Sequence, residues 1–221
     1  MAIDSAKVVS AVSGLRLVGN EDGLIPAFGL YLTRHYADYY NRISFAFLHH
    51  MERADPGGFA KARKALIETG HLCGFNTFGG IMLSQEWEAV VAPMIETRED
   101  WVRGMVAVVN ALGWGRWETK SLRPAEELHV TCANSYESEG YLRDYPQRPD
   151  GGVCFLATGG VSAIMNLLYH GDITTRPQRT EDYYQKIFAA GDNRFEGREI
   201  ACRASGAPRC EWVARPVQRW S

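Results

Sequence analysis

The sequence lacks the features of a membrane protein or a nucleic-acid-binding protein. No apolar run reaches the roughly 18 residues that a membrane-spanning helix needs. Lys and Arg number 24 and Asp and Glu number 26, so the net charge of -2 gives no electrostatic reason to expect nucleic acid or an acidic membrane as a partner. The first residues, Met-Ala-Ile-Asp-Ser-Ala-Lys, lack the charged flank and apolar stretch of a secretory signal. We therefore expect no nucleic-acid partner and no membrane.

Cysteine is too sparse and too unevenly spaced for a disulfide framework or a zinc ribbon. The chain has five cysteines, an odd number that argues against a set of disulfides and suits a reducing compartment. No Cys-x-x-Cys pair is present, which excludes the two gripping hairpins of a zinc ribbon. The Gly79-Gly80 and Gly159-Gly160 pairs form no phosphate-binding fingerprint after a strand, so they indicate close helix packing. The expected location is cytoplasmic.

What is present is the pattern of a globular chain with one well-buried core. At 221 residues, a single core with at most a small appended subdomain is expected. Apolar periodicity and the positions of Gly and Pro predict helices over residues 26–51, 59–91, 101–112, 136–142, 153–169 and 181–190. They predict strands over residues 116–122, 127–133, 194–202 and 209–215. This order predicts an α+β fold, a mainly antiparallel sheet covered by helices.

The first two predicted strands alternate between apolar and polar residues. Two sets of side chains are expected to share a face of their strands: Trp117, Thr119 and Ser121 in one, and Leu128, Val130 and Cys132 in the other. Cys132 should therefore point into the core or a pocket. His129 lies on the opposite face, which makes it a poor catalytic base for a Cys132 nucleophile.

The N-terminal segment is predicted to be a helical arm. Tyr36, Tyr40 and Phe47 recur near helical spacing and would supply an aromatic face for a second copy of the chain. We therefore divide the chain into a helical dimerisation segment, residues 1–60, and a domain, residues 61–221. The expected assembly is a homodimer.

The strongest chemical signal is Glu199, Cys202 and Cys210 near the C-terminus, with Cys154 upstream. Three thiolates and one carboxylate can close a tetrahedral shell around Zn²⁺, and a closed shell is typical of a structural metal. The alternative is that the cysteines are ordinary core thiols, because cysteine is among the most buried residue types. An unpaired buried Glu199 would then be costly. Guanidinium groups that could offset the negative charge stand beside the motif: Arg198, Arg203 and Arg209.

Three motifs in this order make the chain resemble the 4-vinyl-reductase-like domain family. They are residues 134–139 (Asn-Ser-Tyr-Glu-Ser-Glu), residues 153–159 (Val-Cys-Phe-Leu-Ala-Thr-Gly) and the spacing Glu199-x-x-Cys202-x7-Cys210. In particular, the chain resembles the N-terminal sensory domains of phenol- and xylene-responsive transcription activators. The match covers roughly residues 65–216.

The resemblance implies a structural zinc beside a buried pocket for an aromatic effector. The implied zinc ligands are Cys154, Glu199, Cys202 and Cys210. Residues just before the Asn-Ser motif line the cavity in the related domains, which puts Cys132 or Ala133 near any ligand. Trp101 and Trp117 serve either the core or the wall of such a cavity, because tryptophan presents a large apolar surface. We therefore expect a Zn²⁺ cofactor and a small apolar or aromatic ligand in residues 61–221.

The sequence also departs from that family. Roughly twenty extra residues, 171–192, separate the Cys154 helix from the last hairpin. The sensory relatives continue into an ATPase domain and a helix-turn-helix, which this sequence lacks, so direct activation of transcription is not expected. The alternative function is a small-molecule enzyme on the same fold, a hydrolase or ring-modifying enzyme acting on a small heterocyclic or amino-acid-derived substrate. Its candidate residues are Cys132, His129, Tyr183 and Asp182.

Overall fold

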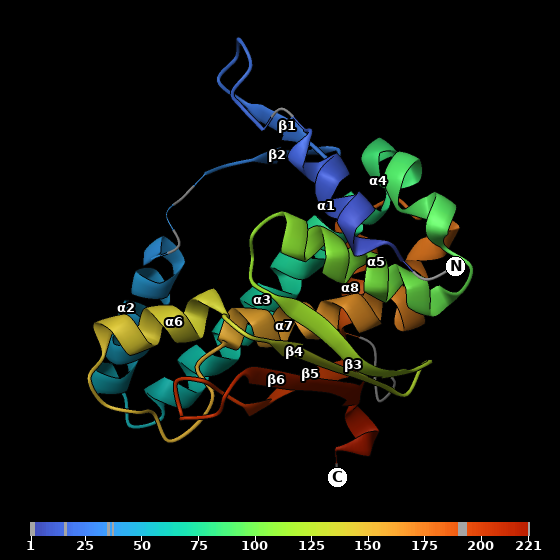
Figure 1. Ribbon diagram of the computed structural model, residues 1–221. Coiled ribbons are helices and arrows are strands. Elements are labelled where there is room, and N and C mark those ends of the chain that lie inside the picture. Colours follow the sequence, from blue (N-terminus) through green and yellow to red (C-terminus); the bar gives the residue numbers. More distant parts are fainter. Residues whose placement is uncertain (1–2, 16, 35, 37, 190–193, 221) are drawn as a thin grey trace.

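The computed structural model describes residues 3–15, 17–34, 36, 38–189 and 194–220 (Figure 1). The helices are α1 (Ser5–Ser13), α2 (Asp38–Ala54), α3 (Gly58–Met82), α4 (Gln85–Val90), α5 (Arg98–Ala111), α6 (Tyr136–Asp144), α7 (Phe155–Met165) and α8 (Glu181–Ala189). The strands are β1 (Ile25–Ala27), β2 (Leu30–Leu32), β3 (Trp117–Arg123), β4 (Glu127–Cys132), β5 (Phe195–Ala201) and β6 (Cys210–Pro216). A π-helical turn, Asn166–His170, extends α7, and 3-10 turns cover Ala92–Met94, Ile173–Thr175 and Val217–Arg219.

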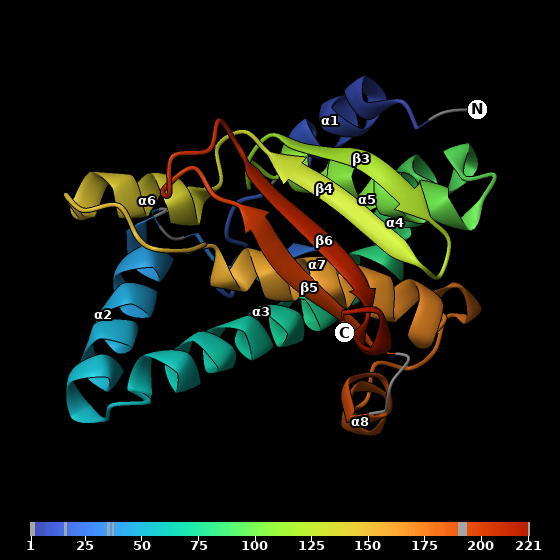
Figure 2. The same cartoon turned by 90° about the horizontal axis from the view of Figure 1, so that it is seen from below.

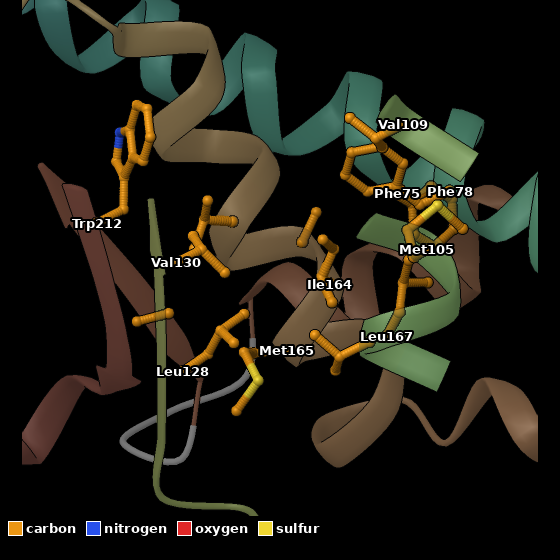
Figure 3. Packing of buried hydrophobic residues seen from close by; sticks show 14 of the residues in the cluster. Phe75, Phe78, Met105, Val109, Leu128, Val130, Ile164, Met165, Leu167 and Trp212 are labelled. Carbon is orange, nitrogen blue, oxygen red and sulfur yellow. The ribbon is translucent and has the colours of Figure 1, made fainter. Parts of the chain in front are cut away.

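The four C-terminal strands form one antiparallel sheet in the order β3-β4-β6-β5. Helices cover one face, and Figure 2 shows the sheet in front with the helices behind it. Helix α7 packs on β5 and β6, and α3 packs on α7. Figure 3 shows Ile164 of α7 and Leu167 of the π-helical turn lying between the apolar side chains of the sheet and those of α3 and α5. The predicted α+β class is confirmed.

Side-chain alternation in β4 follows the prediction, but a β-bulge changes β3. Leu128, Val130 and Cys132 are all buried against the helices. The pairing of β3 with β4 shifts register between Thr119 and Ser121, so Ser121 pairs with His129 on the outer face. The predicted grouping of Ser121 with Trp117 was therefore wrong, because the bulge inserts one residue and reverses the alternation after it.

The predicted helix over residues 26–51 was wrong over residues 26–34. Strands β1 and β2 pair around a two-residue turn in which Phe28 and Gly29 have φ of 54° and 64°. Positive φ at both positions is the mark of a type I′ hairpin turn, which no α-helix can pass through. The backbone N–H of Phe28 donates to Glu86 at 3.0 Å and ties this hairpin to α4. Helix α2 begins only at Asp38.

The predicted helix over residues 59–91 is two helices. Helix α3 ends at Met82, and the hydroxyl of Ser84 accepts the N–H of Trp87 at 3.1 Å to cap α4. Helix α5 begins at Arg98, three residues before the predicted start, because Asp100 accepts the backbone N–H of Thr97 at 2.9 Å in a capping box.

Close packing of α3 on α7 depends on glycine. A Cβ on Gly159 would lie 2.0 Å from the carbonyl oxygen of Ile67, so only glycine allows the two helix backbones to approach this far. The remaining N-terminal helices pack on the same body, α1 on α5 and α2 on α3 and α6. Among the described residues, no helix combines the length and apolarity that crossing a membrane requires.

Candidate functional site

Four predicted ligands gather in one cluster where the end of β5, the start of β6 and the start of α7 meet. The Sγ atoms of Cys154, Cys202 and Cys210 and a carboxylate oxygen of Glu199 all lie within 4.8 Å of one another. Cys154 caps α7, Glu199 lies on β5, and Cys210 opens β6. The three sulfurs are buried, with Cys154 and Cys210 at 0% exposure. This group can hold a metal ion.

A second β-bulge explains how residues three apart on a strand reach the same site. Side chains at positions i and i+3 of a regular strand point to opposite faces. The pairing of β5 with β6 shifts register between Glu199 and Ala201, so one extra residue restores the parity. Glu199 and Cys202 therefore face the same cluster. The spacing of Glu199 and Cys202 can be read from the sequence, but the bulge between them arises from the pairing of β5 with β6.

Hydrogen-bond donors surround the ligand atoms. The N–H of Arg203 lies 3.4 Å from Cys210 Sγ, and the hydroxyl of Ser135 lies 3.3 Å from Cys154 Sγ. The N–H of Cys154 donates to Glu199 Oε2 at 2.9 Å. The other carboxylate oxygen, Glu199 Oε1, is buried and has no hydrogen-bond partner in the described part of the chain. A buried oxygen without a donor is the observation that a cation would explain.

The electrostatics of the cluster favour a bound cation. Burial raises the pKa of Glu199 to about 8 and raises the pKa of Cys154 well above its usual range. Hydrogen bonds from the thiols of Cys154 and Cys202 lower the pKa of Cys210 to about 4. Ionising Glu199 and Cys154 together in this largely buried site is therefore costly without a counter-charge. A divalent ion would stabilise the ionised ligands together.

Helix α6 supports the cluster in a way that the sequence reading did not foresee. The carboxylate of Glu137 accepts the N–H groups of Leu156 and Ala157, each at 2.9 Å, and so caps the first turn of α7 beside Cys154. Burial raises the pKa of Glu137 to about 8, although these two bonds act in the opposite direction. Glu139, on another side of α6, pairs with Arg203 at 2.6 Å.

Both glutamates therefore brace the cluster instead of forming an acid–base pair. The spacing Glu-x-Glu on a short helix was the sequence signal for two separate roles, because side chains two residues apart on a helix reach two different neighbours.

The structure does not show the expected offset of the cluster's negative charge by three arginines. Each guanidinium pairs with a carboxylate outside the cluster: Arg198 with Glu196 at 3.2 Å, Arg203 with Glu139 at 2.6 Å and Arg209 with Glu211 at 3.8 Å.

Two of the three predicted ligand-contacting residues lie together, next to the cluster of Cys154, Glu199, Cys202 and Cys210. Trp117 pairs with Cys132 across β3 and β4, and Cys132 pairs with Cys210 across β4 and β6. These three residues form one row across the sheet, and directly opposed side chains share a face. The Trp117 ring also stacks on Trp212, with ring centroids 4.7 Å apart. Trp101 lies elsewhere, near the start of α5 with its ring 5.4 Å from that of Trp87.

The residues proposed for an enzyme are not brought together. Burial raises the pKa of the Cys132 thiol to about 11, which disfavours a thiolate nucleophile. His129 lies on the outer face, 3.0 Å from Glu211. The hydroxyl of Tyr183 donates to the carbonyl oxygen of Gly171 at 2.9 Å, and Asp182 is exposed on α8.

Comparison with known proteins shows the fold. No family model and no curated protein matches the chain. Among solved structures, it is similar to the phenol-responsive sensory domain of the transcription activator PoxR, determined with phenol, with a TM-score of 0.66 and 13% sequence identity. The similarity covers 99% of this chain and 94% of that one. The expected likeness to a phenol-responsive sensory domain is confirmed at the level of the fold, whereas the 4-vinyl-reductase-like family stays a prediction.

Proposed function

We propose that this protein is a zinc-braced domain that binds a small hydrophobic or aromatic molecule between its sheet and the helices that cover it. The observation that carries the proposal is the row formed by Trp117, Cys132 and Cys210. It joins a metal ligand directly to two residues that face the apolar interior. A metal that fixes Cys210 therefore also fixes the wall of the binding site.

Zinc is the metal that fits the donor set. Three thiolates and one carboxylate are soft and borderline ligands that suit Zn²⁺ better than Mg²⁺ or Ca²⁺. Zn–S bonds of about 2.3 Å at tetrahedral angles put two sulfurs about 3.8 Å apart. The Sγ atoms of Cys154 and Cys210 are separated by 3.7 Å. Four protein ligands leave no open position for water, so the role of the metal is structural.

The interior beside this row suits an uncharged ligand. Its sheet face carries Val130, Cys132 and Trp212, all buried. Figure 3 shows Met165 of α7 beside Leu128 of the same sheet, and Met105 of α5 beside Phe78 on the helical side of the core. Methionine side chains repack easily, so a small aromatic molecule could enter by displacing them. The fold shared with a phenol-responsive sensory domain supports an aromatic ligand.

The N-terminal residues 1–60 complete the proposal as a dimerisation arm on the ligand-binding domain, residues 61–221. Helix α2 exposes Ile43 at 52% and Phe47 at 38%, which is apolar surface that a second copy could cover. The proposed assembly is a homodimer, and the proposed location is the cytoplasm.

Metal analysis tests the zinc. We expect about one zinc per chain in protein purified without chelator, and loss of that zinc with a stability loss of several kcal/mol in Cys210→Ser. Cys73→Ser is the matched control, because Cys73 is an exposed thiol outside the cluster. Protein that contains no zinc, or a Cys210→Ser variant that keeps it, contradicts the metal assignment.

Calorimetry with phenol tests the ligand. Wild-type protein is expected to bind phenol, and Cys132→Phe, which places an aromatic ring in the proposed ligand position, is expected to bind at least about tenfold more weakly, a loss of about 1.4 kcal/mol. The unchanged zinc content of the variant serves as the control for folding. If both proteins bind phenol equally, the ligand does not lie beside Cys132.

A further inference from the structure

A groove of about 600 Å³ lies between the first half of α3 and the edge strand β5. In Figure 2, α7 lies between these two elements and α8 stands near one end. The apolar walls of the groove come from Phe59, Ile67, Phe155, Phe188 and Phe195. The volume falls within the range of small-molecule sites. Neither Trp117 nor Cys132 lines it, so this space is separate from the interior proposed above.

The edge of β5 is already occupied, which argues against a peptide strand as the ligand. The N–H of Phe195 donates to Asn166 Oδ1 at 2.8 Å, and the N–H of Gly197 donates to the hydroxyl of Ser162 at 2.7 Å. Strand addition needs free main-chain groups along an edge. Asn166 and Ser162 already accept these two main-chain N–H groups, so a small molecule is a better ligand for the groove than a peptide strand.

His71, in the wall of this groove, holds a hydrogen-bond donor without an acceptor. Asn166 Oδ1 accepts the Phe195 N–H, so the Asn166 amide group donates, both to the Phe195 carbonyl at 3.0 Å and to His71 Nε2 at 2.9 Å. Nε2 must then accept, and the proton of the neutral ring lies on Nδ1. Nδ1 is buried and has no partner among the described residues, and His71 as a whole is only 4% exposed.

The charged groups at the groove leave an excess of positive charge. Lys64 pairs with Glu68 at 3.8 Å. Arg198 pairs with Glu196 at 3.2 Å. Glu199 faces the metal cluster. Arg63 and Arg194 also line the groove, and neither has a carboxylate partner in the described part of the chain. Arg194 instead donates to the carbonyl oxygen of Phe188 at 3.1 Å and lies over its ring.

We propose that this groove binds an aromatic carboxylate as a second ligand of the protein. The ring of the ligand lies among Phe188, Phe195 and Ile67, and its carboxylate pairs with Arg194 and Arg63. A carboxylate oxygen that reaches past Phe188, whose ring is 4.9 Å from that of His71, gives the Nδ1–H its missing acceptor.

The test uses 2-naphthoate and 2-naphthamide, which have the same shape but differ in charge. The zinc-loaded protein is expected to bind the carboxylate at least about tenfold more tightly than the amide, by calorimetry. Arg194→Gln and, separately, the exposed Arg63→Gln are expected to remove most of that preference. Lys120→Gln, on the opposite edge strand, is the matched control and keeps it. In ¹⁵N-labelled protein, the His71 Nδ1 proton signal shifts when 2-naphthoate is added.

Failure of this proposal is distinguishable from failure of the interior site. Cys132→Phe is expected to leave 2-naphthoate binding unchanged, and phenol is expected not to displace 2-naphthoate. Equal affinity for the two naphthalene compounds, absence of 2-naphthoate binding, a preference that survives both arginine substitutions, or displacement by phenol each overturns the groove assignment.

Discussion

At the scale of single residues, the buried His71 makes stability depend on pH. Burial, with a smaller contribution from Arg194, lowers its pKa from 6.5 to about 4. As the pH falls below 6.5, the unfolded chain takes up a proton that folded His71 does not accept until the pH nears 4. The unfolded state then binds more protons, so stability falls on acidification.

This predicts that His71 alone costs the protein about 2 kcal/mol of unfolding free energy between pH 7 and pH 5. The measurement is urea unfolding of the wild type and His71→Gln at both pH values. Only the difference in pH dependence between the two proteins is compared, which removes the effect of the substitution itself and of the metal cluster. Equal pH dependence in both proteins would show that His71 titrates normally.

Glu137 and Glu139, two residues apart on α6, are predicted to differ sharply in importance. Glu137 is 2% exposed and caps α7 with two hydrogen bonds, so Glu137→Gln is expected to lose about 1–3 kcal/mol of stability and to bind zinc about 10- to 100-fold more weakly. The Glu139 side chain is 42% exposed, so Glu139→Gln should change stability by less than about 1 kcal/mol. Thermal unfolding and a competitive zinc-chelator titration measure both effects. Similar losses in the two variants would contradict the capping role.

Residue chemistry could be predicted from the sequence where the residue type itself was unusual. Glu199, in a strand-like segment beside two cysteines, indicates a metal cluster from the sequence alone. The supporting glutamates of α6 could not be assigned in the same way, because their roles depend on which elements lie beside that helix. His71 was equally ordinary in the sequence, and its unpaired donor follows only from the bonds that Asn166 makes.

At the scale of elements, the contact between α3 and α7 predicts opposite effects for two neighbouring glycines. A Cβ on Gly159 would lie 2.0 Å from a carbonyl oxygen and 2.4 Å from the backbone nitrogen of His71, so Gly159→Ala is expected to lose about 3 kcal/mol or more, or fail to fold. A Cβ on Gly160 would lie 3.6 Å from the Phe78 ring, so Gly160→Ala should gain up to about 1 kcal/mol from helix propensity. The urea midpoints of the two variants measure these changes in the free energy of unfolding. A well-folded Gly159→Ala variant of normal stability would show that the helices are farther apart.

Element type was predictable where apolar periodicity was long, and failed where backbone conformation decided. The hairpin of β1 and β2 depends on positive φ at Phe28, which carries no sequence signal because a bulky residue rarely adopts it. The bulges after Thr119 and Glu199 were missed for a related reason, since register is set by the partner strand.

At the scale of the whole molecule, the exposed apolar face of α2 predicts self-association. Light scattering is expected to give twice the chain mass of 24.7 kDa, and Ile43→Lys with Phe47→Lys is expected to shift the protein to monomer. Leu72→Lys, which alters another exposed apolar side chain, should leave the dimer intact. A wild-type monomer would remove this role from residues 1–60.

The fold class was predictable from the order of helices and strands, but the strand order was not. Two successive hairpins could form two sheets or one. Pairing of β4 with β6 joins residues about 80 positions apart, and that pairing also creates the row from Trp117 to Cys210. The cluster itself ties these distant strands to α7, so the site and the topology depend on each other.

The bulge in β3 has a further consequence for the protein at high concentration. Regular, unbroken outer strands recruit strands from other chains and so seed fibres. Here the outer strand β3 is interrupted at Lys120, an exposed cationic residue, and on the opposite margin Asn166 and Ser162 accept the N–H groups of Phe195 and Gly197. The sheet therefore has no flat margin on which a cross-β stack could grow, and crowded protein should stay free of amyloid.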